Sequence, residues 1–279
     1  MYAITGVTGH VGGAAARALR DAGHPVRAVV RDATRGGGFT EAAVADFTDR
    51  AALAAALTGA TGAFVLLPTI PAGDDTDHRR LAATIAGAVA DSGVRHVAAL
   101  SSYGAELPEG TGPVRWLHHF ENLLRDTGAR VTAIRSPHFQ EKVEEVLAPA
   151  TGAGIYPVFG ASADVPVPMV ATRDIGAAVA QALLHPPAGD EVVDLTAPEY
   201  TERQVAEALG AVLGRKLEVV TVPREAWIPT WVDAGMPPGL AAELVELYEA
   251  TERGVLVPRG DRSHHATTRI DETLSGLIS

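Results

Sequence analysis

Three glycines stand at intervals of three residues near the start of the chain, in the stretch YAITGVTGHVGGAAARALRDAG. Gly6, Gly9 and Gly12 lie between an apolar tetrapeptide and an alanine-rich run, a pattern typical of a strand that turns into a helix. Such a turn directs backbone N–H groups and the positive end of the helix dipole at one point, where a pyrophosphate is stabilised. Glycine permits the tight turn, the approach of the phosphates and the close packing of helix on strand. The stretch therefore predicts dinucleotide binding.

The end of the second expected strand indicates which dinucleotide binds. This strand reads VRAVVRD, so that Arg31 is followed by Asp32. An arginine here accommodates the 2′-phosphate of NADP(H), whereas an acidic residue binds the ribose 2′-hydroxyl of NAD(H). Arg31 favours NADP(H) over NAD(H). Asp32 as a ribose ligand, and Arg31 as a solvated strand end, are the alternatives.

The elements that must position these residues follow one pattern. Short β-branched runs alternate with longer alanine-rich helical patterns, which is typical of a parallel α/β fold. Glycines that follow the helical patterns, Gly23, Gly59 and Gly93, are expected to end helices, and Thr48 or Asp49 to begin one. We expect a Rossmann-type doubly wound parallel sheet, with strands over residues 2–5, 25–31, 43–47, 63–68, 94–101 and 130–136.

The second half of the chain has a different texture, with more prolines and glycines. Thr201 and Gln204 form a capping-box pattern at the start of a helix. A second helical stretch is broken at residues 235–238. We expect residues 1–150 to form the dinucleotide-binding domain. Residues 151–279 should form a smaller mixed subdomain that covers the substrate and is structurally merged with the first domain.

Composition excludes several classes of function. The 279 residues contain no cysteine, so disulfides, thiolate metal sites and a cysteine nucleophile are excluded. The net charge of -11 with scattered lysines and arginines gives no basic stripe, so neither nucleic acid nor a membrane surface is an expected partner. His264 and His265 are adjacent and lack the spacing of metal ligands, and no metal is expected. We expect a cytoplasmic protein with a small-molecule substrate, and leave a homodimer or a protein partner open.

In several segments the chain resembles an NmrA-like member of the atypical short-chain dehydrogenase/reductase superfamily. The segments are GVTGHVGG in the family's GxxGxxG form, VRAVVRD, VADFTDRAALAAAL, LLRDTGARVTAIRSPHFQE, VATRDIGAAVAQALLHP and LTAPEYTERQVAEALGAVLGRKLEVVTVP. The resemblance implies four groups of cofactor-binding residues: Thr8, His10 and Val11 at the phosphate loop; Asp46 and Phe47 near the adenine; Leu67 and Pro68 beside the ribose; Pro137, His138 and Phe139 near the nicotinamide.

The chain departs from the family at the residues that usually move a proton. A typical short-chain reductase uses Tyr-x-x-x-Lys, in which the lysine lowers the pKa of the tyrosine. Here Tyr103 is followed four residues later by Leu107, and Pro113 and Leu117 stand at the usual positions in PVRWLHHFENLL. The usual relay is therefore missing. A quinone-type acceptor can still take hydride, because its charge is delocalised and water or a nearby acid can protonate it.

The candidate catalytic residues lie where ligands of α/β sheets bind, at the carboxyl ends of strands. Ser101, Ser102 and Tyr103 end the fifth expected strand, with Ser101 also expected near the cofactor. On the next helix His118 is favoured, because it lies one residue from the place where relatives carry the lysine. His118 and His119 point about 100° apart, so that at most one faces the cleft. We name Tyr103, His118 and Ser102 as catalytic candidates.

Two classes of function remain open. The favoured one is an NADPH-dependent oxidoreductase that transfers hydride to a small conjugated acceptor such as a quinone, an enone or an imine. The other is a non-catalytic NADP(H)-binding redox sensor that acts through a protein partner. Trp227, Trp231, Met236 and Tyr248 could close over a substrate or pack at an interface, so they do not separate the two.

Overall fold

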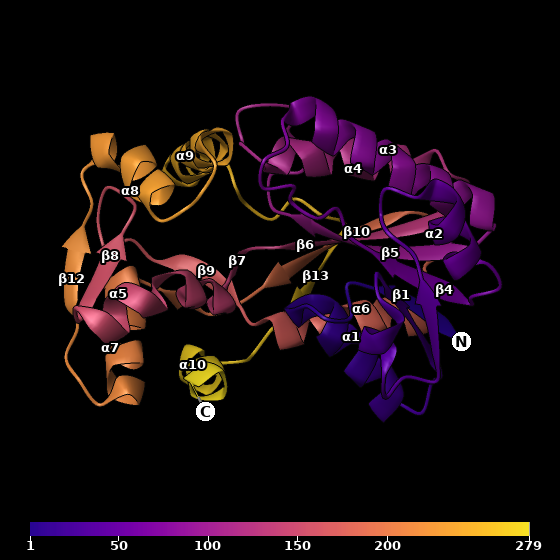
Figure 1. Ribbon diagram of the computed structural model, residues 1–279, viewed down its shortest axis with the longest axis horizontal. Helices are drawn as coiled ribbons and strands as arrows, with labels where there is room; N and C mark the ends of the chain where they lie inside the picture. Colours follow the sequence, from indigo (N-terminus) through magenta and orange to yellow (C-terminus); the bar gives the residue numbers. More distant parts are fainter. Residues whose placement is uncertain (279) are drawn as a thin grey trace.

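The computed structural model describes residues 1–278, which form a larger lobe on one parallel sheet and a smaller lobe beside it (Figure 1). The large sheet has the order β13-β10-β6-β5-β4-β1-β2-β3, and all its strand pairs are parallel. Its strands are β1 (Tyr2–Thr5), β2 (Val26–Val30), β3 (Glu41–Val44), β4 (Gly62–Val65), β5 (His96–Ser102), β6 (Arg130–Ser136), β10 (Glu191–Thr196) and β13 (Arg262–His265).

Helices cover both faces of this sheet, each over its own apolar layer. On one face lie α2 (Arg50–Leu57), α3 (Asp75–Ser92) and α4 (Val114–Arg125); on the other lie α1 (His10–Asp21) and α6 (Thr172–Leu184), as Figure 1 shows. The strand order reverses between β1 and β4, and a crevice for ligands forms at the carboxyl ends of the strands at such a reversal. The predicted doubly wound fold is confirmed.

Local chemistry explains where these elements end. Gly23 and Gly93, with φ of +79° and +66°, follow α1 and α3 in the left-handed conformation that glycine adopts readily. The strand expected over 43–47 was placed too late, because β3 ends at Val44. Asp46 accepts hydrogen bonds from the backbone N–H of Thr48 at 2.9 Å and from its hydroxyl at 2.6 Å. This local turn replaces the ladder of the sheet.

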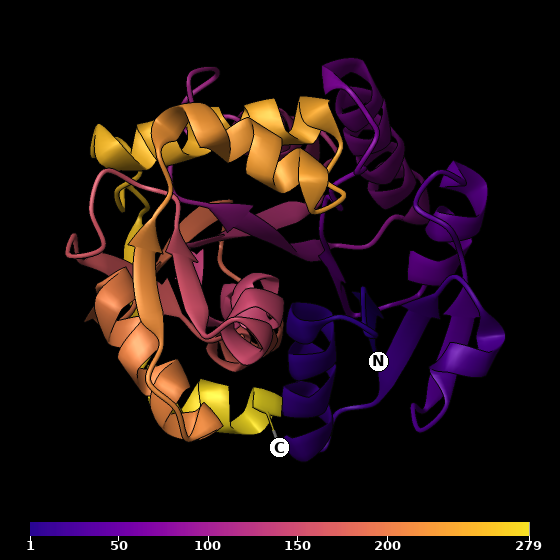
Figure 2. The same ribbon diagram turned by 60° about the vertical axis from the view of Figure 1, so that its left-hand side comes forward.

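The smaller lobe contains two short sheets and most of the later helices. One sheet pairs β8 (Ile155–Val158) with β12 (Glu218–Thr221), and the other has the order β11-β9-β7, from Glu199–Tyr200, Val167–Val170 and His138–Phe139. The helices are α5 (Leu147–Gly152), α7 (Glu202–Leu213), α8 (Trp227–Asp233), α9 (Pro238–Glu252) and α10 (Ile270–Ile278). Figure 2 shows α10 beside α7, with which it shares an apolar cluster.

The second half of the chain belongs to both lobes. Its α6, β10 and β13 join the larger lobe. Conversely, β7 and the 3₁₀ helix η2 (Gln140–Val146) come before residue 150, directly after β6, and β7 joins a sheet of the smaller lobe. The capping box predicted at Thr201 and Gln204 is present at the start of α7. The division into domains at residue 150 stays a prediction.

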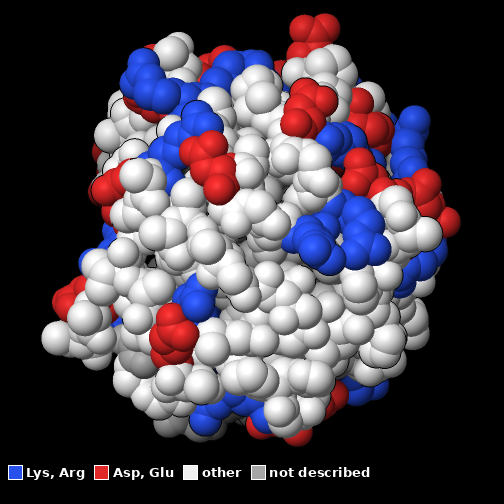
Figure 3. Space-filling model, turned by 90° about the vertical axis from the view of Figure 1, so that its right-hand side faces the viewer, with Lys and Arg blue, Asp and Glu red and all other residues white. Residues whose placement is uncertain are grey.

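The surface carries acidic and basic side chains side by side. On the face in Figure 3, lysines and arginines are interspersed with aspartates and glutamates above a broad uncharged area. Over residues 1–278, no helix combines the length and the apolar character that crossing a membrane requires.

Candidate functional site

The phosphate turn between β1 and α1 depends on its glycines in different ways. Gly6 has φ of +64°, and its carbonyl accepts a hydrogen bond from the N–H of Gly9 at 2.9 Å. A Cβ on Gly12 would lie 2.3 Å from the carbonyl oxygen of Gly6, so the packing of helix on turn requires glycine there. A Cβ on Gly9 would meet nothing closer than 3.5 Å. Gly9 therefore borders open space, which a phosphate needs.

Helix α1 begins at this turn with its first N–H groups free of side-chain caps. Gly9 is its N-cap, and no acidic residue lies in its first turn. Thr8, Gly9 and His10 are exposed, as a phosphate site requires. The side chain of Val11 is buried in the core, so Val11 would serve a phosphate through its backbone N–H. The donors of this turn fit a pyrophosphate.

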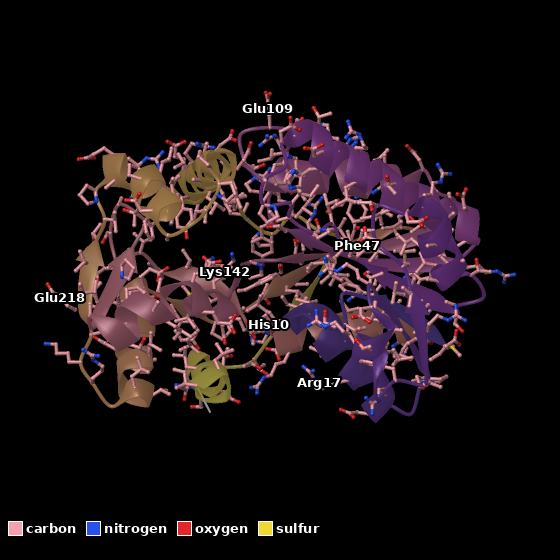
Figure 4. All side chains as sticks on the ribbon, in the orientation of Figure 1. His10, Arg17, Phe47, Glu109, Lys142 and Glu218 are labelled. Atoms are coloured by element: carbon pink, nitrogen blue, oxygen red, sulfur yellow. The ribbon has the colours of Figure 1, made fainter. Side chains whose placement is uncertain are left out.

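The 3₁₀ helix η2, beside the smaller lobe, reaches the phosphate turn. Nε2 of His10 lies 3.2 Å from Oε2 of Glu144 in η2. Figure 4 labels His10 beside α1 and Lys142, also of η2, on the neighbouring part of the smaller lobe. Lys142 itself pairs with Glu145 at 2.5 Å. The two lobes thus meet beside the expected pyrophosphate position.

The ends of β2 and β3 carry the residues expected at the adenine half. Arg31 is exposed and has no side-chain hydrogen bond within residues 1–278. The carboxylate of Asp32 accepts the N–H of Thr34 at 2.9 Å, and this bond lowers its pKa. Hydrogen bonds from Thr48 likewise lower the pKa of Asp46, and Phe47 packs against the core. The positions favour Arg31 over Asp32 as the group available to a ribose 2′-substituent.

A cavity of about 190 Å³ lies at the carboxyl ends of β4 and β5. Its walls come from the segment after β4, the end of β5 and the first turns of α3 and α4: Leu67, Pro68, Thr69, His78, Ser102, Pro113, Val114, Trp116 and Leu117. Three expected residues, Leu67, Pro68 and Ser102, are thereby brought together. A larger groove of about 780 Å³ runs along α7 and residues 215–219 and contains none of the expected site residues.

The residues at the usual positions of the tyrosine and the lysine lie in the wall of this cavity. Pro113 and Leu117, at the usual positions of that pair, both line its wall. Indole Nε1 of Trp116 is already engaged, since it donates to Asp75 at 3.0 Å. Apart from His78, the polar side chains that remain in the wall are the hydroxyls of Thr69 and Ser102. The hydroxyl of Ser102 donates to the carbonyl of Tyr103 at 3.2 Å. The cavity therefore offers hydroxyl groups rather than a strong acid.

The structure counts against Tyr103 as a proton donor. Tyr103 is 4% exposed, and its hydroxyl donates to the carbonyl of Leu195 at 2.5 Å. Burial, with a smaller contribution from the carboxylate of Asp194, raises the pKa of Tyr103 to about 12. Tyr103 thus fastens the end of β5 to β10.

Ser101 also lies away from the cavity, which corrects its assignment to the cofactor. Its hydroxyl donates to Glu121 at 2.6 Å, and the same carboxylate receives two hydrogen bonds from Arg135 at 2.9 and 2.8 Å. All three side chains are buried. The next residue, Ser102, contributes to the cavity wall instead.

His118 does not line the cavity either. Its Nδ1–H donates to the carbonyl of Ala105 at 2.9 Å, which leaves Nε2 to accept from the amide of Asn122 at 3.0 Å. The cavity is reached by Leu117, one residue earlier. Burial and the charge of Arg79 lower the pKa of His119. His118 is thus committed to local bonds, and the geometry does not support it as the proton donor.

The three expected cofactor residues after β6 differ in their exposure. Pro137 is buried, Phe139 packs against the core, and His138 is exposed without a side-chain hydrogen bond inside the described range 1–278. Desolvation nonetheless lowers the pKa of His138, against the opposing effect of Glu202. His138 stays a candidate ligand of the substrate.

Two aromatic rings of the cavity wall escaped the sequence analysis. His78 and Trp116 are stacked, with ring centroids 3.5 Å apart and planes 5° from parallel. Neither carries a motif, since His78 stands in an ordinary helical stretch and Trp116 among apolar residues. Across residues 1–278, no three His, Cys, Asp or Glu side chains are placed to hold a metal ion.

The sheet, its switch point and the open glycine turn define a dinucleotide-binding protein of the Rossmann class. Within this class the chain belongs to the NmrA-like family, whose model matches residues 2–256. The resemblance seen in the sequence is thereby confirmed.

Two curated relatives cover nearly the whole chain. The NAD(P)H azoreductase of Xenophilus azovorans is 28% identical over 254 residues, which are 89% of this chain and 86% of the relative. The (4-alkanoyl-5-oxo-2,5-dihydrofuran-3-yl)methyl phosphate reductase of Streptomyces griseus subsp. griseus is 32% identical over 261 residues, 91% of this chain and 88% of the relative.

Solved structures share the fold over the full length. An NADPH-dependent quinone oxidoreductase from Escherichia coli, complexed with NADPH, matches with a TM-score of 0.82 and 23% identity over 100% of both chains. The triphenylmethane reductase of a Citrobacter species matches with a TM-score of 0.80 and 23% identity over 99% of both chains.

Proposed function

We propose that this chain is an NADP(H)-dependent oxidoreductase that transfers hydride to a small conjugated acceptor, such as a quinone, an enone or an imine. Both curated relatives are named as reductases, and one of them for NAD(P)H. The two solved structures of the same fold are a quinone oxidoreductase with NADPH and a dye reductase. These relatives support the predictions of an enzyme and of NADP(H). The nature of the acceptor is the new part of the proposal.

The observation that carries the acceptor class is the wall of the 190 Å³ cavity. The wall includes Leu67, whose neighbour Leu66 lies against the phosphate turn at Gly6. Pro113 and Leu117 make the wall apolar where a tyrosine and a lysine usually stand. A simple ketone needs a proton as hydride arrives, because its oxygen takes the full negative charge. A conjugated acceptor spreads that charge and can be protonated later. A wall without a strong acid therefore favours conjugated acceptors.

Each part of the site has a separate task in this proposal. The N–H groups at the start of α1 bind the pyrophosphate, and Arg31 binds the 2′-phosphate. Leu67 and Pro68 flank a ribose, and Ser102 donates a hydrogen bond to the acceptor. NADPH supplies the hydride. The apolar residues Val114 and Leu117 exclude water from the reacting atoms.

Turnover tests the proposal directly. Purified protein is mixed with NADPH and a panel of quinones, enones and imines, and the loss of NADPH absorbance is followed. We expect oxidation with at least one conjugated acceptor and none with matched saturated ketones. Ser102→Ala should lower kcat more than it changes the affinity for NADPH. Tight binding of NADPH without turnover of any acceptor would instead support the alternative, a redox sensor with a protein partner.

A further inference from the structure

His78 lies at the meeting point of the cavity and the segment that follows β4. It is fully buried in the first turn of α3 and contributes to the cavity wall. The segment 66–70 runs past it and supplies Leu67, Pro68 and Thr69 to the same wall. No role has been given to this histidine so far.

The hydrogen bonds of His78 fix its protonation state and its tautomer. The backbone N–H of Ile70 donates to Nε2 at 2.9 Å, and an N–H can only donate. Nε2 is therefore an acceptor without a proton. Nδ1 lies 2.7 Å from the carbonyl of Asp74, to which it must donate its own proton. The imidazole is neutral and links segment 66–70 to the N-terminus of α3.

The ring of His78 is held from a second direction. Its face stacks on Trp116 of α4, whose indole N–H donates to Asp75. Asp75 also pairs with Arg79 at 2.6 Å and with Arg115 at 3.2 Å. Arg115 continues to Glu243 of α9. The imidazole is thus clamped between two helices, so it can serve as a fixed anchor for segment 66–70, which has no regular secondary structure of its own.

The anchored segment touches the phosphate turn and the cavity. A Cβ on Gly6 would lie 2.8 Å from Cδ2 of Leu66, so Leu66 covers the phosphate turn. Leu67 to Thr69 then form the wall of the cavity at the ends of β4 and β5. Arg31, which marks the adenine half, lies on the other side of β1, at the end of β2. Displacement of the segment would therefore disturb the nicotinamide side of the site.

We propose that His78 is a positioning residue for the nicotinamide half of the cofactor, because its Nε2 holds segment 66–70 against the phosphate turn and the cavity. The inference rests on the proposed function, since it needs NADPH to occupy this site. It concerns binding rather than chemistry, so the test does not depend on the identity of the acceptor.

The test uses two substitutions that separate the hydrogen bond from the stacking. His78→Phe keeps a ring against Trp116 but removes the acceptor for the N–H of Ile70. His78→Gln loses the ring but can accept from Ile70 and donate to Asp74. The affinities for NADPH and for 2′,5′-ADP, which lacks the nicotinamide half, are measured by calorimetry in wild type and both variants. Hydrogen exchange of residues 66–73 is followed without ligand.

We expect His78→Phe to weaken NADPH binding about tenfold, the effect of losing one hydrogen bond to a buried group. Binding of 2′,5′-ADP should change less than twofold, and exchange in 66–73 should accelerate. His78→Gln should restore most of the affinity. Unchanged NADPH affinity in His78→Phe, equal losses for both ligands, or failure of the glutamine to restore binding would each overturn the inference. Wild type that binds no NADPH would instead refute the proposed function itself.

Discussion

His96, the first residue of β5, should make the stability of the fold depend on pH. The side chain is 2% exposed, and Nε2 lies 3.0 Å from the hydroxyl of Thr132 on β6. Burial lowers the pKa of His96 from 6.5 to about 4, with Arg130 acting in the same direction and Glu191 against it. The folded protein therefore holds the neutral imidazole.

The size of the effect follows from the difference between the two pKa values. Above pH 6.5 both the folded and the unfolded state hold a neutral imidazole, and the full stability is present. As the pH falls from 6.5 to about 4, the unfolded state binds a proton that the folded state excludes. The difference of about 2.5 units, at 1.36 kcal/mol per unit, costs about 3 kcal/mol of unfolding free energy. This is a large share of the ~5–15 kcal/mol that stabilises a typical protein.

Urea unfolding at a series of pH values from 7.5 to 4 measures this loss in wild type and in His96→Leu. The carboxylates titrate in both proteins, so the difference between the two curves isolates His96. We expect the leucine variant to lose about 3 kcal/mol less over this range. His185→Gln, a change at an exposed histidine, should follow wild type. Parallel curves for wild type and His96→Leu would refute the assignment of a buried neutral imidazole.

Three further outcomes are expected at the site. Gly9→Ala should unfold like wild type but bind NADPH at least tenfold more weakly, whereas Gly12→Ala should lower the melting temperature, because its Cβ meets the Gly6 carbonyl. Calorimetry measures the NADPH affinity and thermal unfolding measures the stability. The same affinity and the same melting temperature in both variants would contradict a phosphate-facing Gly9 and a packing role of Gly12. Arg31→Ala should lose about 1.5 to 3 kcal/mol of NADPH affinity and leave NADH affinity unchanged; similar affinities of wild type for both cofactors would argue against the 2′-phosphate contact. Tyr103→Phe should cost about 1 kcal/mol of stability, since its hydroxyl bonds the Leu195 carbonyl, and keep turnover within a few-fold of wild type; a ~100-fold loss of rate with intact binding would restore Tyr103 as the proton donor.

The backbone of the larger lobe could be predicted because its signals are local. The strands expected over 2–5 and 130–136 coincide with β1 and β6, since buried parallel strands are short apolar runs between turn residues. The glycine turn is likewise contained in a few neighbouring residues. β3 was misplaced because the side chain of Asp46 ends it, and a turn made by one carboxylate is hard to distinguish from a strand.

The side chains of the site were harder to predict, because their directions depend on distant partners. Ser101 turns from the cavity to meet Glu121, twenty residues later, and Arg135 on the next strand. Leu117 rather than His118 faces the cavity because of how α4 is rotated on the sheet. His78 reaches the wall only because α3 begins at Asp75, after its N-cap Asp74, and the segment after β4 folds back to it. None of these relations leaves a pattern in the sequence.

The buried charges beside the sheet explain how a cavity with few polar groups keeps its shape. The carboxylate of Glu121 is shared by Ser101, Arg135 and Arg125, and Arg135 also bonds Glu106. Removing one member would leave a charge buried without its partner, which is strongly unfavourable, so β5, β6 and α4 are held in one arrangement. Ser101 is fixed in this network, and the next residue, Ser102, lines the cavity at the end of β5. Under the proposed function, its hydroxyl would position an acceptor without supplying a strong acid, which suits hydride transfer to a conjugated acceptor.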